Sequence, residues 1–121
     1  MTRSTSSLQE FKQYREKMNE KILAQGGLGI KRFFNLDTQA YLDGALSQKT
    51  KELLGLVASL VLRCDDCVTY HIIQCVENKV SDAEFFETFN IGLVVGGSIT
   101  IPHLRHAVEM LEECRKKEAK S

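Results

Sequence analysis

The sequence of 121 residues contains one proline, no tryptophan and no excess of either charge. Because proline is the residue that most disrupts helices, Pro102 leaves nearly all of the chain free to be helical. Lysine and arginine together number 16, as do aspartate and glutamate, so the formal net charge is zero. Nucleic acids and anionic membranes bind surfaces rich in positive charge, and this balance disfavours both as partners.

The sequence also lacks a long apolar run. Its first residues include no hydrophobic segment followed by a small-residue cleavage site, and no stretch is apolar over the roughly 20 residues that cross a bilayer. We therefore expect a cytoplasmic protein. The length and the 43% content of hydrophobic residues are enough for one core, so a single domain over residues 1–121 is expected.

Apolar residues recur every three or four positions instead of alternating, which predicts helices and no strand. The first helix, over residues 7–25, is expected to form an amphipathic N-terminal arm that the pair Gly26–Gly27 ends. The stretch 26–29 resembles a linker. After it, Asp37 is expected to cap a short helix that ends at Leu46.

Two helices are expected in the middle of the chain. Ser47 can cap a helix over residues 48–63, which is apolar on most sides and is therefore suited to a core or a subunit interface. Asp65 and Asp66 supply carboxylates that can cap the next helix, which is expected to end near Asn78.

Two further helices complete an all-α bundle of about five to six helices. Ser81 and Glu84 have the spacing of a capping box, before a helix that the pair Gly96–Gly97 ends. Pro102 opens the last helix, whose charged end is expected to fray. The helices at 48–63 and 82–95 are apolar on too many faces for a monomer of this size to cover, which predicts a symmetric homo-oligomer.

Three of the four cysteines, Cys64, Cys67 and Cys75, lie within twelve residues. In a chain without a secretory signal, a CxxC pair is typical of catalysis or metal binding, not of a disulfide scaffold. Amides at a helix N-terminus favour a thiolate, whereas the two intervening aspartates disfavour it, and the direction of their carboxylates is left open. His71, one turn after Cys67, can serve as its general base.

The pattern of Glu52, eleven residues, and Cys64-x-x-Cys67-x-x-x-His71 resembles the alkylhydroperoxidase-D-like branch of the carboxymuconolactone decarboxylase family, over about residues 45–112. The resemblance implies an all-helical fold that forms trimers or hexamers. We expect no cofactor and no metal. The resemblance also implies that Cys67 attacks a hydroperoxide, that Cys64 closes a disulfide and that an external dithiol reduces it. Glu52 and His71 would form a proton relay.

Three alternatives stay open. Asp66 stands where the family often has a second histidine, so a disulfide substrate is as well supported as a hydroperoxide. Cys64, Cys67 and His71 could supply three zinc ligands, although a structural zinc site needs a fourth. A non-redox lyase could act on a small acidic substrate, with His71 or His103 as the base.

Other residues of the same types have simpler interpretations. Cys75 and Cys114 are expected to pack as small hydrophobic side chains. His103 and His106 could contact a metal or a substrate, but a structural role, as a cap or a surface group, is favoured for them.

Overall fold

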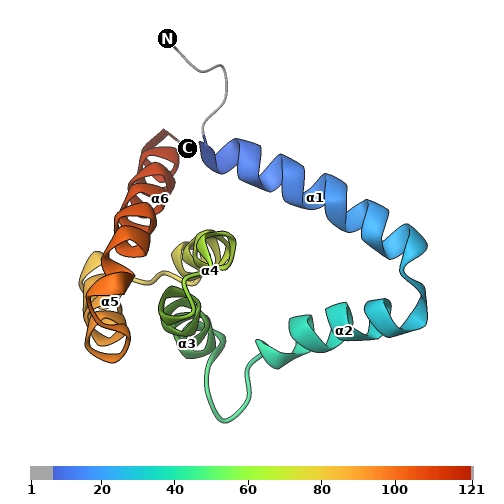
Figure 1. The fold of residues 1–121 in the computed structure, drawn as a ribbon, viewed down its shortest axis with the longest axis horizontal. Helices are drawn as coiled ribbons and strands as arrows, with labels where there is room; N and C mark the ends of the chain where they lie inside the picture. Colours follow the sequence, from blue (N-terminus) through green and yellow to red (C-terminus); the bar gives the residue numbers. More distant parts are fainter. Residues whose placement is uncertain (1–6, 121) are drawn as a thin grey trace. The chain divides into compact units, whose positions relative to one another are not determined.

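The computed structural model of the protein describes residues 7–120, which form six α-helices, one short 3₁₀ helix and no strand (Figure 1). This confirms the all-helical fold class. Residues 1–6 of the expected N-terminal arm and Ser121 lie outside the described residues. The chain packs as two compact units, which divide between Leu42 and Asp43. Within residues 7–120, no helix has both the length and the apolar composition required to cross a membrane.

The first unit contains helices α1 (Ser7–Gln25) and α2 (Gly27–Ala40). The bounds of α1 confirm the first expected helix. The expected linker at 26–29 is wrong, because the chain turns at Gly26 alone and the new helix begins at the next residue. The Gly26 amide donates to the Ile22 carbonyl at 2.7 Å, which closes α1.

The short helix expected from Asp37 to Leu46 is also wrong, because Asp37 lies inside α2 and the chain is non-helical after Tyr41. Apolar residues at Ile30, Phe33 and Phe34 continue a helical pattern before Asp37. Such a pattern is typical of a helix, and α2 continues across Asp37 although a glycine inside a helix costs about 1 kcal/mol relative to alanine.

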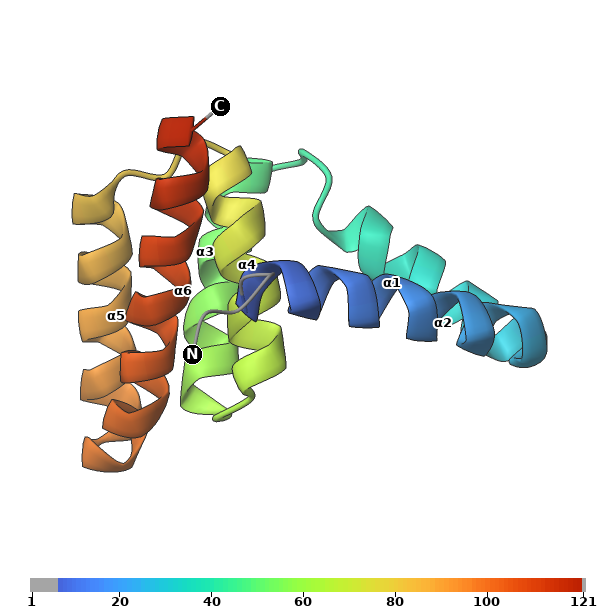
Figure 2. The same cartoon turned by 90° about the horizontal axis from the view of Figure 1, so that it is seen from above.

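The second unit contains helices α3 (Gln48–Val61), α4 (Asp65–Glu77), α5 (Asp82–Gly96) and α6 (Ile101–Lys120), with the 3₁₀ helix η1 (Ser98–Thr100) between the last two. The four helices run alongside one another in a bundle (Figure 2). Helix α3 packs against α4 and α5, and α4 packs against α6. Their shared core includes the fully buried side chains of Leu56, Leu60, Val68, Ile72, Phe85 and Phe89.

Local capping signals fix the starts of α3 and α5 where the sequence predicts them. The Ser47 hydroxyl accepts the amide of Thr50 at 3.1 Å, at the start of α3. Ser81 and Glu84 form the predicted capping box of α5, in which each side chain accepts the other residue's amide. Gly97, with a φ of +81°, ends α5 in a conformation that favours glycine.

The expected fraying of the C-terminal tail is wrong, because α6 continues to Lys120. Arg115 explains the difference. Its guanidinium donates to the Asp82 carboxylate at 2.9 Å and to the Val80 carbonyl at 2.8 Å, and it lies 5.6 Å from the centre of the Phe85 ring. These contacts tie the second half of α6 to the start of α5, as long arginine side chains can do through both stem and charge.

Candidate active site at the start of α4

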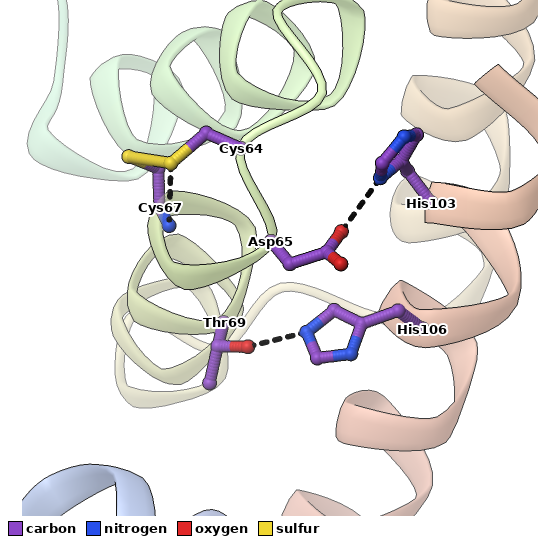
Figure 3. The surroundings of a disulfide bond; sticks show 6 residues. All are labelled: Cys64, Asp65, Cys67, Thr69, His103 and His106. Atoms are coloured by element: carbon purple, nitrogen blue, oxygen red, sulfur yellow. Dashed lines mark hydrogen bonds and ion pairs between the residues drawn. A yellow bond between two sulfur atoms is a disulfide. The ribbon is translucent and has the colours of Figure 1, made fainter. Parts of the chain in front are cut away.

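Cys64 and Cys67 form a disulfide at the start of α4, with their Cα atoms 5.3 Å apart. Cys64 is the N-cap residue: its backbone is extended, and its Sγ accepts the amide of Cys67 at 3.3 Å (Figure 3). The prediction that Asp65 and Asp66 cap this helix is therefore wrong. Both aspartates lie inside the first turn, where their negative charges interact favourably with the positive end of the helix dipole.

The two sulfur-bearing residues differ in accessibility. Cys67 is exposed, whereas Cys64 is half-buried. The chain reaches them from α3 through Arg63, which adopts a φ of +62° and reverses the backbone before Cys64. An attacking or reducing molecule can therefore approach the pair from solvent, with Cys67 the easier residue to reach.

Glu52 and His71, which the sequence predicts as catalytic residues, meet inside the bundle. His71 Nδ1 on α4 lies 2.8 Å from Glu52 Oε1 on α3, and the two residues are only 8% and 2% exposed. A carboxylate that is buried so deeply needs a partner, and the imidazole supplies it. Because Glu52 engages Nδ1, Nε2 is the nitrogen through which His71 could exchange a proton with another group.

The face of α4 that carries Cys67 also carries His71 and Cys75, at successive intervals of four residues. Burial, and after it the negative charge of Glu52, together raise the pKa of the Cys75 thiol to about 12. Cys75 therefore stays protonated at neutral pH. It and Cys114 are buried, which confirms their expected packing role.

Two further polar contacts link α4 to α6. His103 Nδ1 lies 2.8 Å from Asp65 Oδ1, and His106 Nε2 lies 2.7 Å from Thr69 Oγ1. Figure 3 shows the Asp65 side chain directed toward α6, with the two sulfur atoms on the other side of the α4 start. Neither contact was predicted, because each joins residues that are more than thirty positions apart.

The zinc alternative requires Cys64, Cys67 and His71 to converge as ligands. Among residues 7–120, no three histidine, cysteine, aspartate or glutamate side chains are grouped so that they could hold a metal ion.

Comparisons with known proteins agree with this architecture. The model of the carboxymuconolactone decarboxylase family matches residues 29–112. A crystal structure of the Thermotoga maritima protein TM1620 has a TM-score of 0.90 and 57% sequence identity, over 93% of this chain and 98% of that one. A second crystal structure of that protein has a TM-score of 0.88, over 92% of this chain and 94% of that one. The Thermotoga maritima protein is described there as a member of the family with a suggested part in the antioxidative response.

Two more distant matches add less. The apo form of a Legionella pneumophila family protein, 24% identical, has a TM-score of 0.84 over 91% of this chain and 98% of that one, which shows the shared fold. An uncharacterised protein of Cupriavidus necator is 31% identical over 55 residues, or 46% of this chain. The chain spans about half the length of this curated relative, 49%.

Proposed function

Because the chain belongs to the carboxymuconolactone decarboxylase family, we propose that it is a thiol-dependent peroxidase or disulfide reductase whose redox centre is Cys64 and Cys67. One observation carries the proposal: the two cysteines are bonded at an accessible helix start, one turn before a buried histidine–glutamate pair. The suggested antioxidative role of the Thermotoga maritima protein, at 57% identity, supports the same activity.

The proposed cycle begins with the reduced pair. The Cys67 thiolate attacks one oxygen of a hydroperoxide, the O–O bond breaks, and an alkoxide leaves while Cys67 becomes a sulfenic acid. The Cys64 thiol then attacks that sulfur, which forms the disulfide and releases water. An external dithiol reduces the disulfide by exchange and leaves as its own disulfide. For a disulfide substrate, Cys67 attacks one sulfur, the substrate's S–S bond breaks, and a mixed disulfide on Cys67 forms while one thiolate leaves. Cys64 then attacks the Cys67 sulfur, which forms the Cys64–Cys67 bridge and releases the second half of the substrate as a thiol.

Glu52 and His71 would manage the protons of this cycle. His71 accepts the thiol proton through Nε2 and returns it to the departing alkoxide, while the Glu52 carboxylate at Nδ1 stabilises the imidazolium in between. The helix N-terminus stabilises negative charge on either sulfur. Cys67 is the better nucleophile of the two because it is exposed and lies one turn from His71.

We also propose that the protein is a homo-oligomer, a trimer or a hexamer. Helix α5 and the segment after it expose large apolar side chains, which would be costly to leave in water and which a second copy of the chain could cover. These side chains are Phe86 at 52%, Ile91 at 56%, Val94 at 75%, Val95 at 68% and Ile99 at 57% exposure. A folded monomer in sedimentation at micromolar concentration would contradict this assembly.

The activity can be tested on the reduced protein. After one equivalent of an organic hydroperoxide, and in parallel an organic disulfide, peptide mass mapping should show a Cys64–Cys67 bridge. Cys64→Ser should stop at a sulfenic acid on Cys67 with the hydroperoxide, trapped by a dione reagent, and at a mixed disulfide on Cys67 with the organic disulfide. Cys67→Ser should form no bridge with either. Cys75→Ser is the matched control, because its thiol is buried and protonated, and it should behave as the wild type.

The proposal fails if Cys64 and Cys67 remain free thiols with both oxidants while circular dichroism shows an intact fold. It also fails if Cys67→Ser keeps the wild-type rate of oxidant consumption. Formation of the bridge with only one of the two oxidants would identify the substrate class.

A further inference from the structure

Asp65 places a carboxylate directly after Cys64, in the motif that has to carry a thiolate. A negative charge beside a thiol opposes its ionisation, and so weakens it as a nucleophile. The position of this carboxylate therefore matters to any chemistry of the pair. Its Oδ1 lies 2.8 Å from His103 Nδ1, on a helix that starts 36 residues after Asp65.

The geometry separates the carboxylate from the sulfurs. Figure 3 shows Asp65 extended from the start of α4 toward α6, while the Cys64 and Cys67 sulfurs lie on the opposite side of the same turn. The His103 and Asp65 side chains remain 25% and 48% exposed. A pair this accessible adds little to stability. Its effect is to fix the direction of the carboxylate.

A second contact between α4 and α6 can serve as a control for the contact of His103 with Asp65. One turn further along α4, the buried Thr69 hydroxyl meets His106 Nε2 at 2.7 Å. This contact holds α4 against α6 but involves no carboxylate. The two histidines on α6 therefore both join the helices, and only His103 engages a charge next to the cysteines.

We propose that His103 is a positioning residue of the redox centre, which holds the Asp65 carboxylate toward α6 and away from the Cys64 and Cys67 sulfurs. In this position the carboxylate still interacts favourably with the helix N-terminus, and it opposes a negative charge on sulfur less than it would if it turned toward the pair. The inference rests on the proposed dithiol function, and it adds a residue of α6 that the sequence pattern does not contain.

The test measures the alkylation of Cys67 by iodoacetamide against pH in the fully reduced protein, with the site located by peptide mass mapping. His103→Ala releases the carboxylate, so the midpoint of the profile should move up by about half a unit and the rate at pH 7 should fall about threefold. His103→Gln can still donate to Asp65, and it should restore most of the wild-type rate.

Two further variants separate charge from packing. His106→Ala breaks the neighbouring contact between α4 and α6 without releasing a charge, so it should leave the midpoint unchanged. The double variant Asp65→Asn with His103→Ala removes the released charge and should return the rate at pH 7 to the wild-type value or above it. A role limited to packing predicts instead that the double variant is as slow as His103→Ala.

The inference is overturned if His103→Ala leaves the midpoint unchanged, if His106→Ala moves it equally, or if the double variant stays slow. Because alkylation needs no turnover, these outcomes are separate from those for the proposed function. A wild-type protein that forms the Cys64–Cys67 bridge with an oxidant, yet shows no shift in His103→Ala, would refute the positioning role alone.

Discussion

The buried contact between Glu52 and His71 predicts a large energetic coupling that a double-mutant cycle can measure. Glu52→Leu leaves His71 Nδ1 without this partner at a position that is only 8% exposed. The loss of one partner from a buried hydrogen bond costs about 1–3 kcal/mol. His71→Leu leaves a carboxylate that is 2% exposed without the imidazole, and a buried carboxylate that loses its partner costs more, about 3–5 kcal/mol.

The double variant should be far more stable than the sum of these losses predicts. With leucine at both positions, neither member of the pair is left without the other and the volume is largely refilled, so we expect a stability within about 2 kcal/mol of the wild type. Urea unfolding at one fixed protein concentration measures the free energies, since any assembly of the chain makes them depend on concentration. If the losses of the two single variants simply add in the double variant, the coupling inferred from the 2.8 Å contact is refuted.

The same double variant separates fold from chemistry. It should regain most of the stability but still lack the relay, so the oxidation of the reduced cysteines by hydroperoxide should remain slower by about a hundredfold or more. A stable double variant that reacts at the wild-type rate would show that Glu52 and His71 serve only the packing of α3 on α4.

Three other variants test separate features. In the folded protein, burial and the charge of Glu52 raise the pKa of Cys75 from 9.0 to about 12, so the unfolded chain loses this proton first as the pH rises. The free energy of unfolding should therefore fall above about pH 9, by up to about 1.4 kcal/mol per pH unit. Cys75→Ala should flatten that slope in urea titrations at several pH values. Thr100→Val removes a buried hydroxyl that has no hydrogen-bond partner within residues 7–120, and it should raise the free energy of unfolding by about 1 kcal/mol, whereas a lower melting temperature would contradict this. The hydrogen bond from the Ser81 amide, and after it the contact with Lys49, lowers the pKa of Glu84 below 4.5. The stabilisation by the ionised Glu84 is therefore present above pH 4.5 and is lost as the pH falls through the lowered pKa. Glu84→Gln should destabilise the protein at pH 7 and not in stronger acid, and equal losses of stability at the two pH values would refute the reasoning.

The starts of α3, α5 and α6 were predictable because their signals are local. Each signal acts on amides or dihedral angles within one helical turn: these are Ser47 for α3, the pair Ser81 and Glu84 for α5, and Pro102 for α6. The errors arose where a local signal competed with a longer pattern. Asp37 is a good capping residue, but it lies inside the amphipathic repeat of α2 and is helical there.

The candidate site was predictable in its residues but not in its contacts. The spacing of Cys64, Cys67 and His71 is visible in the sequence, and the family resemblance adds Glu52. The contact of His103 with Asp65 depends on the packing of α6 against α4, which no short-range pattern encodes. The same holds for Arg115, whose partners at the start of α5 hold the second half of α6 against it.

Cys64 has a second role as the N-cap of α4, and this bears on how oxidation and folding are related. A disulfide between residues three positions apart closes a short loop, so it restricts the unfolded chain less than a bond between distant residues would. The cap needs only a sulfur atom that can accept the Cys67 amide, and a thiol or a thiolate can do so as well as a disulfide. The bond between these cysteines can therefore be made and broken repeatedly while the helix that carries them stays intact, so that the redox state of the pair can follow its surroundings without unfolding the protein.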